Sequence, residues 1–522
     1  MAIRKKTIIG ALAVPLLVLV VGLGVLQWRA KSIVANFLSR KIPNHMALAY
    51  SNIETNILGG DVILRDIALN ISNRDTVLNH TSFTAQSLKI NGLNYGQLFF
   101  KNTIYLDALT LKEPVLRYSP FNHHQKTGHT KKGIVGLLKT IFIQNLKIDN
   151  GSFYLFQEGK DSIKMAVESY NLMLSEGETG PMLITKKIPL SFKDYRLEVR
   201  ETFVDMGTFE TLNTSKIIIS PNDSQINNIV LATKYSKEKL STHLTVERDY
   251  VDLTIPKLEI GELNLGFKSD RFLVTVFESR FYRPNLEIYR DKRLPDNLQE
   301  KPLYSRLLRE LPIGIDIAKI SISDGYVAYE EKIEDTRKAG MLYFKQLDAR
   351  INNIDNTGEN KERTRVRASA EILGDGKLDL DWGFHINDPA DTFTMSGSLM
   401  DLDSEKLSTF LKPNLRVKAK GTIDAMYFNF QGDSRESKGD MKMKYRDFRF
   451  EVLDRDRLKI NKFLTFIGNI FVNDGSKADE DGFRFGDIET ERDVTKSFFN
   501  YLWQNMENGI LNTLTGDGKK DT

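Results

Sequence analysis

The feature that most constrains the fold is an apolar spacing that occurs four times in the chain. In "IFIQNLKIDNGSFYLF", residues 141–156, apolar or turn-forming residues stand at offsets 0, 2, 5, 7, 10, 12 and 14. The same offsets fit stretches that start at Ile104, Val274 and Ile315, with Ser279 at one apolar place. Offset 10 is Pro in the copies at 104 and 274 and Gly in the other two. The copies therefore come in pairs, a Pro version followed by a Gly version.

The pairs themselves are repeated. The two Pro versions start 170 residues apart, and the same interval relates "SLKINGLNYG" at 87–96 to "KLEIGELNLG" at 257–266. Leu88 then matches Leu258, and Ile90 matches Ile260. A tandem duplication explains both correspondences.

Each copy is predicted to be a β-meander. The alternating offsets are typical of strands, and the three-residue step from 2 to 5 is typical of a β-bulge. Gly or Pro at offset 10 then predicts a turn, as in a tight turn at Asn150-Gly151 between two strands. Between the Pro and Gly copies, "KGIVGLLKT" and "LYSRLLREL" predict short amphipathic helices, with Leu137-Leu138 and Leu307-Leu308 as their apolar edges.

The alternation of apolar and polar residues is more regular beyond residue 360. The strand patterns at 366–372 and 378–386 flank Gly374-Asp375-Gly376, which predicts a hairpin. A short helix is predicted near Ser404 to Leu411, ended by Pro413, and strands at 417–430 and 441–452 follow.

Long strands with one apolar face must cover that face with something. A second sheet or a few helices would serve, and so would a hydrocarbon ligand. Period two does not show which face is the inner one. The candidate residues for an apolar groove are Leu88, Ile90, Leu106, Leu111, Ile143, Ile148, Ile260, Ile317, Ile322, Leu378, Leu380, Trp382, Phe384, Phe428 and Phe430.

The N-terminus predicts a membrane anchor. Residues 8–26 carry no charge, with Arg4, Lys5 and Lys6 before them and Arg29 after them. A cleaved signal peptide is the alternative, although it would have a shorter apolar core. Basic residues flank the segment almost equally on its two sides, so the charge count does not settle the orientation. Long domains are translocated largely regardless of such charges, which favours a short tail on the inner side of the membrane and a large body on the outer side. Apolar residues at helical spacing from 32 to 38 predict that the helix continues along the membrane surface.

The C-terminus predicts an amphipathic helix. Val494, Phe498, Leu502, Met506, Ile510 and Leu514 recur every four residues, and Asp493 is placed as an N-cap. Its apolar face is Phe498, Leu502, Met506 and Ile510. The helix could cap the end of the sheet or dock on a membrane or an envelope protein partner.

Composition and motifs argue against most other functions. The chain has no cysteine, which excludes disulfides, thiolate nucleophiles and Cys-based metal sites. Net charge is only +4 and basic residues are dispersed, which argues against nucleic-acid binding. No catalytic motif is present, so we expect no enzyme and no cofactor. Two possible metal sites are better explained as solvated loops, namely His123, His124 and His129, and Asp474, Asp479, Glu480 and Asp481.

Three stretches resemble a known family. "FTAQSLKINGLNYGQLFFKNTIYLDALTLKEPVLRY" is similar to the opening module of AsmA-like envelope proteins. "LPIGIDIAKISISDGYVAYEE" resembles their second recurring module, and "GSLMDLDSEKLSTFLKPNLRVKAKGTIDAMYFNFQG" resembles their C-terminal part. The resemblance implies an inner-membrane anchor, a periplasmic β-rich body with an apolar groove, a role in phospholipid movement or outer-membrane integrity, and kinship with chorein-type bridge proteins.

We therefore expect a mainly β fold: an elongated, curved antiparallel sheet or half-pipe of duplicated meander units, with short helices, one transmembrane helix and a C-terminal amphipathic helix. The expected function is non-enzymatic carriage or shielding of phospholipid acyl chains for outer-membrane lipid homeostasis, from a single-pass protein of the bacterial inner membrane whose bulk is periplasmic. The alternative is a membrane-anchored structural or assembly factor with a self-filled β-sandwich and no lipid cargo. The expected segments are 1–7, a cytoplasmic tail; 8–27, the anchor; 28–44, a juxtamembrane helix; 45–230 and 231–400, two β units; 401–492, a C-terminal β section; and 493–522, the helix and a polar tail.

Overall fold

A computed structural model describes most of the chain after the expected anchor. The described residues are 24–25, 27–32, 34–36, 38, 46–72, 79–101, 103–120, 139–183, 186–187, 189–268, 270–358, 362–453 and 478–516. Within these ranges, no helix is both long and apolar enough to cross a bilayer. Almost all of the expected anchor, the expected helix near residue 137, the three histidines at 123–129 and Asp474 lie outside the described residues.

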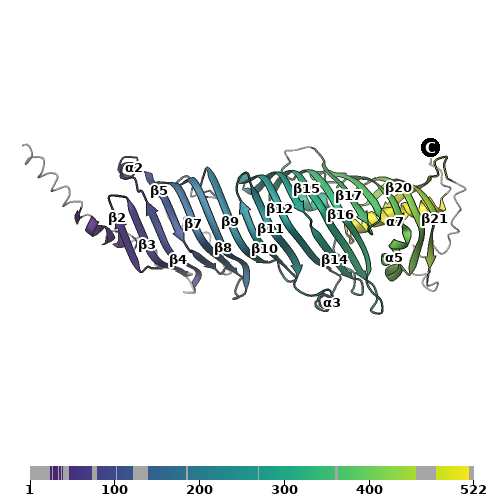
Figure 1. Ribbon diagram of the computed structural model, residues 1–522, viewed down its shortest axis with the longest axis horizontal. Coiled ribbons are helices and arrows are strands. Elements are labelled where there is room, and N and C mark those ends of the chain that lie inside the picture. The colour runs from purple at the N-terminus through teal and green to yellow at the C-terminus, as the bar shows by residue number, and fades with distance from the viewer. Residues whose placement is uncertain are drawn as a thin grey trace, which may run out of the picture. The chain divides into compact units, whose positions relative to one another are not determined.

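The described residues are mainly strand, with 22 strands in a sheet of mixed pairing (Figure 1). The chain divides into two compact units. Unit 1 is Met1–Met206 with Asn213–Pro221, and unit 2 is Gly207–Leu212 with Asn222–Thr522. Strand β10 (Glu210–Ile219) contributes residues to both.

Unit 1 contains nine further strands and one short helix after its N-terminal helical residues. They are β1 (Met46–Ala49), β2 (Asn52–Asn56), β3 (Asp61–Ser72), β4 (Asn79–Asn91), α2 (Tyr95–Phe100), β5 (Thr103–Lys112), β6 (Val115–Tyr118), β7 (Thr140–Phe156), β8 (Ile163–Thr179) and β9 (Asp194–Asp205).

Unit 2 contains the remaining strands and helices. They are β11 (Ser224–Thr233), α3 (Lys237–Leu240), η1 (Ser241–His243), β12 (Asp249–Lys268), β13 (Arg271–Tyr282), β14 (Asn285–Asp291), α4 (Tyr304–Arg309), β15 (Gly314–Lys332), β16 (Gly340–Asp355), β17 (Thr364–Ile372), β18 (Gly376–Phe384), β19 (Phe393–Asp403), η2 (Ser404–Leu407), α5 (Ser408–Leu415), β20 (Val417–Gly432), β21 (Glu436–Val452), β22 (Arg484–Glu491) and α7 (Phe498–Thr515).

The Pro and Gly copies of the repeated spacing lie side by side in parallel. In unit 1, β5 and β6 pair with β7 so that Ile104 faces Ile141 and Leu111 faces Ile148. In unit 2, β13 and β14 pair with β15 in the same way. The sheet is therefore mixed, and the expectation of a purely antiparallel sheet is wrong. Equal spacings pair in register because each apolar residue of one copy then lies beside an apolar residue of the other.

The pairing before each Pro copy also recurs at the interval of 170 residues. In unit 1, Ser87 lies opposite Lys112, and in unit 2 Lys257 lies opposite Tyr282. Both β4 and β12 pair with the two halves of the Pro copy that follows them.

The turn predicted at Asn150-Gly151 is absent. Strand β7 runs without interruption from Thr140 to Phe156. Asn150 adopts a left-handed conformation with φ of 53°, and the pairing of β7 with β8 shifts at Gly151. This arrangement is a β-bulge, which changes the alternation of faces without reversing the chain. Each copy is therefore one strand, broken only where Pro replaces Gly, and not a meander.

The predicted helices and hairpin after residue 300 are present with altered ends. The sequence "LYSRLLREL" contains α4, and β17 and β18 form the predicted hairpin around Gly374. Helix α5 continues through Pro413 to Leu415 and does not end at the proline. Arg416 ends it because its left-handed backbone donates a hydrogen bond back to Leu411.

The C-terminal helix begins four residues later than the apolar spacing predicted. Its N-cap is Ser497, whose side chain accepts the Asn500 N–H, and not Asp493. Asp493 instead accepts the N–H and hydroxyl of Thr495 in the preceding turn. Val494 is therefore outside the helix.

Most of the buried core lies in unit 2. A large cluster joins strands β15 to β22 with residues of α4, α5 and α7. Unit 1 has a small cluster of Ile53, Leu64, Ile67 and Ala85. Helical residues Val34, Ala35 and Leu38 pack against that small cluster. These three residues pack on the sheet, and the position of the helix along the membrane surface stays a prediction.

Candidate functional site

One face of unit 1 carries continuous rows of apolar side chains across its strands. Residues directly opposite each other in a sheet point to the same face. Following the pairings from β2 to β9 gives one uninterrupted apolar row, which we call row A. Row A is Ile53, Leu64, Leu88, Leu111, Ile148, Leu172 and Leu197.

A second row lies two residues further along each strand and therefore on the same face. This row B is Val62, Ile90, Leu109, Leu146, Leu174 and Tyr195. Rows A and B together are called the unit 1 apolar face below. Most of their side chains are half-buried, while Ile53, Leu64 and Leu174 are buried.

The residues between these rows point to the opposite face and are mainly polar. Lys89, Thr110, Lys147, Met173 and Arg196 pair in sequence across β4 to β9. Ion pairs such as Lys147 with Asp149 and Lys216 with Glu198 also lie on strands of the unit. The sheet is thus amphipathic, with one face suited to water and the other to hydrocarbon.

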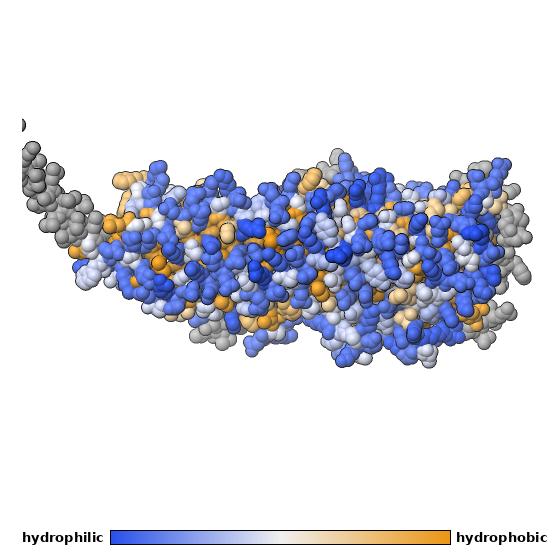
Figure 2. Space-filling model, in the orientation of Figure 1, coloured by the Kyte–Doolittle hydropathy of each residue, from blue (hydrophilic) through white to orange (hydrophobic). Residues whose placement is uncertain are grey.

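In the described residues, a small buried cluster covers the unit 1 apolar face at one end. Val34, Ala35 and Leu38 pack over β2, β3 and β4 through the small buried cluster. The small cluster reaches Leu111 of β5, and no cluster of buried apolar residues covers β6 to β9 in this part of the chain. In the view of Figure 2, apolar side chains also reach the surface at several places over the strands of unit 1. The half-buried leucines and isoleucines beyond β4 can therefore offer apolar surface to a guest.

Unit 2 carries similar rows. Row C runs from β11 to β22 as Ile226, Leu258, Phe281, Ile322, Ala349, Ala368, Leu380, Gly397, Phe428, Met441 and Gly486. Row D runs from β15 to β22 as Ile320, Ile351, Val366, Trp382, Met395, Phe430, Gly439 and Ile488.

Helices fill the far part of these rows. Tyr304 of α4 contacts Trp382 and Phe498 edge to face, and Trp382 stacks on Phe498 of α7 with 4.8 Å between ring centroids. Phe410 of α5 contacts Trp503 of α7. Helices α5 and α7 lie against the strands near β20 and β21 in Figure 1. Met441 and Met443 are fully buried beneath this layer.

Glycines allow α7 to approach the sheet closely. A Cβ on Gly509 of α7 would lie 2.8 Å from Met441 and 2.9 Å from Ile488, and one on Gly486 of β22 would lie 2.3 Å from the Thr513 nitrogen. Any larger side chain at either glycine would push the helix away. This contact is tight packing of the chain on itself, with no room for a guest.

Buried polar groups also hold α7 in place. Asn505 is fully buried, and its Oδ1 accepts the hydroxyl of Ser437 at 2.7 Å. The buried guanidinium of Arg484 donates to the carbonyls of Thr513 and Gly516 at the end of the helix, each at 3.0 Å. A cation at a helix C-terminus is electrostatically favourable. The apolar stripe alone predicted neither of these two anchors.

The predicted groove residues fall into two groups. The first includes rows A and B and their neighbours; Leu106 and Ile143 are buried against each other as a direct pair. Ile260 and Ile322, in unit 2, also belong to the first group, because both are half-buried and neither is part of the large cluster. The second group belongs to the large cluster that includes α7. It comprises Ile317, Leu378, Leu380, Trp382, Phe384, Phe428 and Phe430.

The predicted apolar face of the C-terminal helix packs inward. Phe498 is buried, and Leu502, Met506 and Ile510 are half-buried against the large cluster. The most buried positions include Tyr501, Asn505, Gly509 and Thr513, which the apolar spacing did not single out. Glycine inside a helix and glycine in strands opposite Phe or Met are the sequence signals that could have indicated this close contact.

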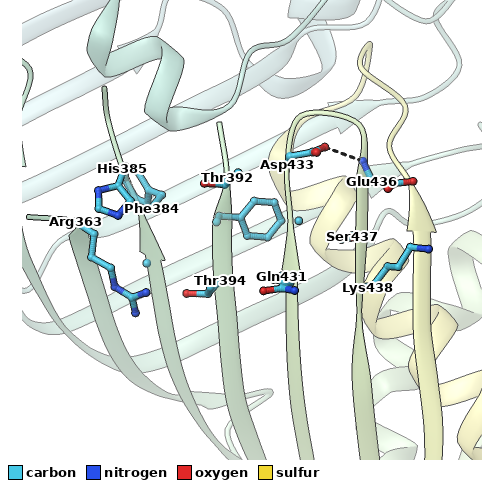
Figure 3. A pocket seen from close by; sticks show the side chains of 13 residues that line it. Arg363, Phe384, His385, Thr392, Thr394, Gln431, Asp433, Glu436, Ser437 and Lys438 are labelled. Carbon is cyan, nitrogen blue, oxygen red and sulfur yellow. Dashed lines mark hydrogen bonds between the residues drawn. The ribbon is translucent and has the colours of Figure 1, made fainter. Parts of the chain in front are cut away.

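Two polar cavities lie elsewhere in unit 2. Figure 3 shows the first, about 480 Å³, at the ends of β18 to β21, with Arg363, His385, Asp433 and Lys438 around it. Asp433 accepts the backbone N–H of Glu436, drawn as a dashed line. No predicted groove residue except Phe384 lines this cavity. Most of the residues that line this cavity are polar or charged, unlike those of rows A and B.

The second cavity, about 670 Å³, has an ion-pair network in its wall. Asp291 accepts hydrogen bonds from the Arg293 guanidinium and from the hydroxyl of Ser241. The Arg293 hydrogen bonds, helped by Ser241, lower the pKa of Asp291 to about 2. Lys237 contacts Glu330 at 2.9 Å and Glu287 at 3.3 Å, and these carboxylates raise its pKa although burial alone would lower it. These contacts join α3 and η1 to β14 and β15.

Compared with models of known protein families and with curated protein sequences, the chain matches none of them.

Proposed function

We propose that the chain is a non-enzymatic envelope protein that shields phospholipid acyl chains on the unit 1 apolar face. The observation that carries this proposal is the run of half-buried leucine and isoleucine side chains across β4 to β9, opposite a polar face. Extended apolar surface of this kind on a folded protein marks an interaction site.

A diacyl phospholipid carries roughly 30 methylenes, and exposing each to water costs about 0.8 kcal/mol, so passage through water costs on the order of 20 kcal/mol. Contact with an apolar face removes much of this cost without any specific polar contact. Rows A and B supply such contact through spacing and apolar character, which is also what the four copies of the repeat have in common.

The proposed setting follows from the N-terminus and from the resemblance to AsmA-like proteins. The uncharged segment 8–26 would hold the chain in the inner membrane of a bacterium, with the bulk in the periplasm. A phospholipid of that membrane would be the cargo, and outer-membrane lipid homeostasis the purpose. An envelope protein could be a partner at the C-terminal helix.

One observation favours the alternative, an anchored assembly factor with no cargo. Helices α4, α5 and α7 fill the far part of rows C and D, as in a self-filled sandwich. If the unit 1 apolar face were filled in the same way, only the assembly role would remain. The two functions therefore differ in what covers β5 to β9.

A photo-crosslinking experiment on the full-length chain in its native membrane tests the proposal. A photoreactive amino acid replaces Ile148 of row A in one variant and Lys147, the preceding residue on the opposite face, in another. After irradiation, adducts are identified by mass spectrometry. We expect phospholipid adducts at position 148 and few at position 147, because adjacent strand residues point to opposite faces.

The comparison between neighbouring residues controls for general exposure to membrane lipid. Equal yields at the two positions, or no lipid at position 148, would overturn the proposal and leave the assembly role.

A further inference from the structure

Large apolar side chains project from one end of unit 1. Leu58, in the turn between β2 and β3, is 76% exposed, and Phe99 and Phe100 of α2 are 74% and 89% exposed. Side chains of this size are normally buried, and a group of them on a surface indicates a binding site for something apolar.

The two segments that carry these side chains are fixed to each other. The Tyr95 hydroxyl donates to the Ile57 carbonyl at 2.8 Å, and the Leu93 N–H donates to the Gly60 carbonyl at 3.0 Å. Gly60 has φ of 68°, and a Cβ there would lie 2.6 Å from the Leu93 nitrogen. The turn and α2 therefore form one rigid tip, which we call the apolar tip, defined by Leu58, Phe99 and Phe100.

Gln27 of the N-terminal helix lies beside the apolar tip. The side-chain amide of Gln27 donates to the Thr55 carbonyl at 2.5 Å and accepts the Ile57 N–H at 2.7 Å. Trp28, the next residue, is 80% exposed. Because Gln27 directly follows the uncharged residues 8–26, the predicted membrane segment ends next to the tip.

The charges near the tip suit an anionic membrane. Arg29, Lys31 and Lys101 are exposed on the helix and at the end of α2, and the ammonium of Lys139 donates to the Leu98 carbonyl of α2 at 3.2 Å. Aromatic side chains with nearby Lys and Arg are typical of segments that lie at the boundary between lipid headgroups and acyl chains.

We propose that the apolar tip inserts into the surface of the bilayer that holds residues 8–27. Leu58, Phe99 and Phe100 then lie among the upper parts of the acyl chains, and Arg29, Lys31 and Lys101 lie at the phosphates. Row B begins in the strand after Leu58, at Val62, so insertion brings the unit 1 apolar face to the membrane. Acyl chains can then reach that face without crossing water. The inference rests on the proposed function for this last step only.

Fluorescence quenching in nanodiscs tests the insertion. Because the chain has no cysteine, single labels can be attached to full-length Leu58→Cys and Phe100→Cys variants. The nanodiscs contain phosphatidylethanolamine and phosphatidylglycerol, with and without bromine on the acyl chains. The control is Met206→Cys, 53% exposed and directly after β9, at the strand ends opposite the tip in the same unit.

We expect brominated lipid to quench labels at positions 58 and 100 several-fold more than the label at position 206. Adding Phe99→Ser to the Leu58→Cys variant should reduce that quenching, because Phe99 contributes about a third of the inserted surface. Both results would support insertion. Equal quenching at 58, 100 and 206 would overturn it.

The outcome is separable from that of the proposed function. If labels at 58 and 100 are quenched but no phospholipid adduct forms at position 148, the tip inserts and the carrier function fails. If an adduct forms at position 148 without quenching at the tip, the carrier function stands and the insertion is overturned.

Discussion

At the scale of single residues, a polar residue in left-handed conformation sets the phase of each repeated strand. Glu113, Asn150, Arg283 and Asp324 precede Pro or Gly at offset 10, and each has φ between 48° and 53°. In the sequence, this conformation corresponds to the three-residue step from offset 7 to offset 10. The spacing predicted a turn at offset 10, but a bulge produces the same break in alternation, and the prediction of a reversal in chain direction was wrong.

Asp291 should make the stability of unit 2 depend on pH in the acid range. Its pKa of about 2, below the ordinary value of 3.8, means that folding favours the carboxylate. The stabilisation is full above pH 3.8 and is lost as pH falls toward 2. Its size is about 2 kcal/mol. We expect Asp291→Asn to lower the thermal unfolding midpoint at pH 6, with a smaller difference from the parent at pH 2.5.

Asp401→Asn is the control, since the Asp401 side chain is 71% exposed and 4.0 Å from its nearest lysine nitrogen. It should change the midpoint little at either pH. An Asp291→Asn difference that stays the same from pH 6 to pH 2.5 would contradict the explanation.

At the scale of elements, pairing between copies decided the character of the sheet. Equal apolar spacing is compatible with hairpins and with parallel neighbours, so the spacing alone did not show whether the copies pair in parallel or antiparallel. The long connections between the copies were the available signal, because parallel strands need a crossover of a dozen residues or more. In unit 2 that crossover contains α4, whose N-cap Leu303 is buried in the large cluster and whose Tyr304 contacts Trp382.

Helix α7 also closes the edge of the sheet in unit 2. Asn508 Oδ1 accepts the Glu489 N–H at 2.9 Å, and Asn512 Nδ2 donates to the Asp487 carbonyl at 2.7 Å. These amides bind β22 as a neighbouring strand would. Within the described residues β22 pairs only with β21, so its other edge would otherwise be open to association. Gln27 binds β2 of unit 1 in the same way.

The double substitution Asn508→Ala and Asn512→Ala should loosen this edge. One hydrogen bond contributes about 1 kcal/mol, so hydrogen exchange at the Glu489 amide should become about fivefold faster. Mass spectrometry of peptides that contain Glu489 measures the rate.

Asn500→Ala, on the same helix but outside this pair of contacts, should leave the exchange unchanged. Unaltered exchange in the double variant would show that α7 covers the strand by packing alone.

At the scale of the whole molecule, the apolar rows of the two units are covered by different elements and to different extents. In unit 1, helical residues cover β2 to β4, and rows A and B continue to β9 with side chains that are half-buried except Leu174. In unit 2, α4, α5 and α7 pack on rows C and D. Charged substitutions such as Leu380→Asp or Phe384→Asp would therefore damage packing in unit 2 and would not report on cargo.

The distribution of lipid contacts should follow these covers. Photoreactive residues at Leu109 and Leu172 on the unit 1 apolar face should form phospholipid adducts. The same residue at Met441, which is fully buried beneath α7, should form adducts only within the chain.

Mass spectrometry of each purified variant distinguishes the two kinds of adduct. Melting temperatures confirm that the Met441 variant is folded. Lipid adducts at Met441 in the folded protein would contradict the view that α7 fills this part of the face.

The sequence by itself determined which residues share a face, how the pattern repeats, and that no cysteine chemistry takes part. These properties are local, because alternation follows from backbone geometry over a few residues. Only the tertiary structure decided that the copies pair in parallel and that α4, α5 and α7 cover the apolar side of unit 2. Apolar burial is not directional, so the sequence around a leucine in row A or a methionine in row C does not indicate which element will cover that side chain. That depends on contacts between residues far apart in the chain.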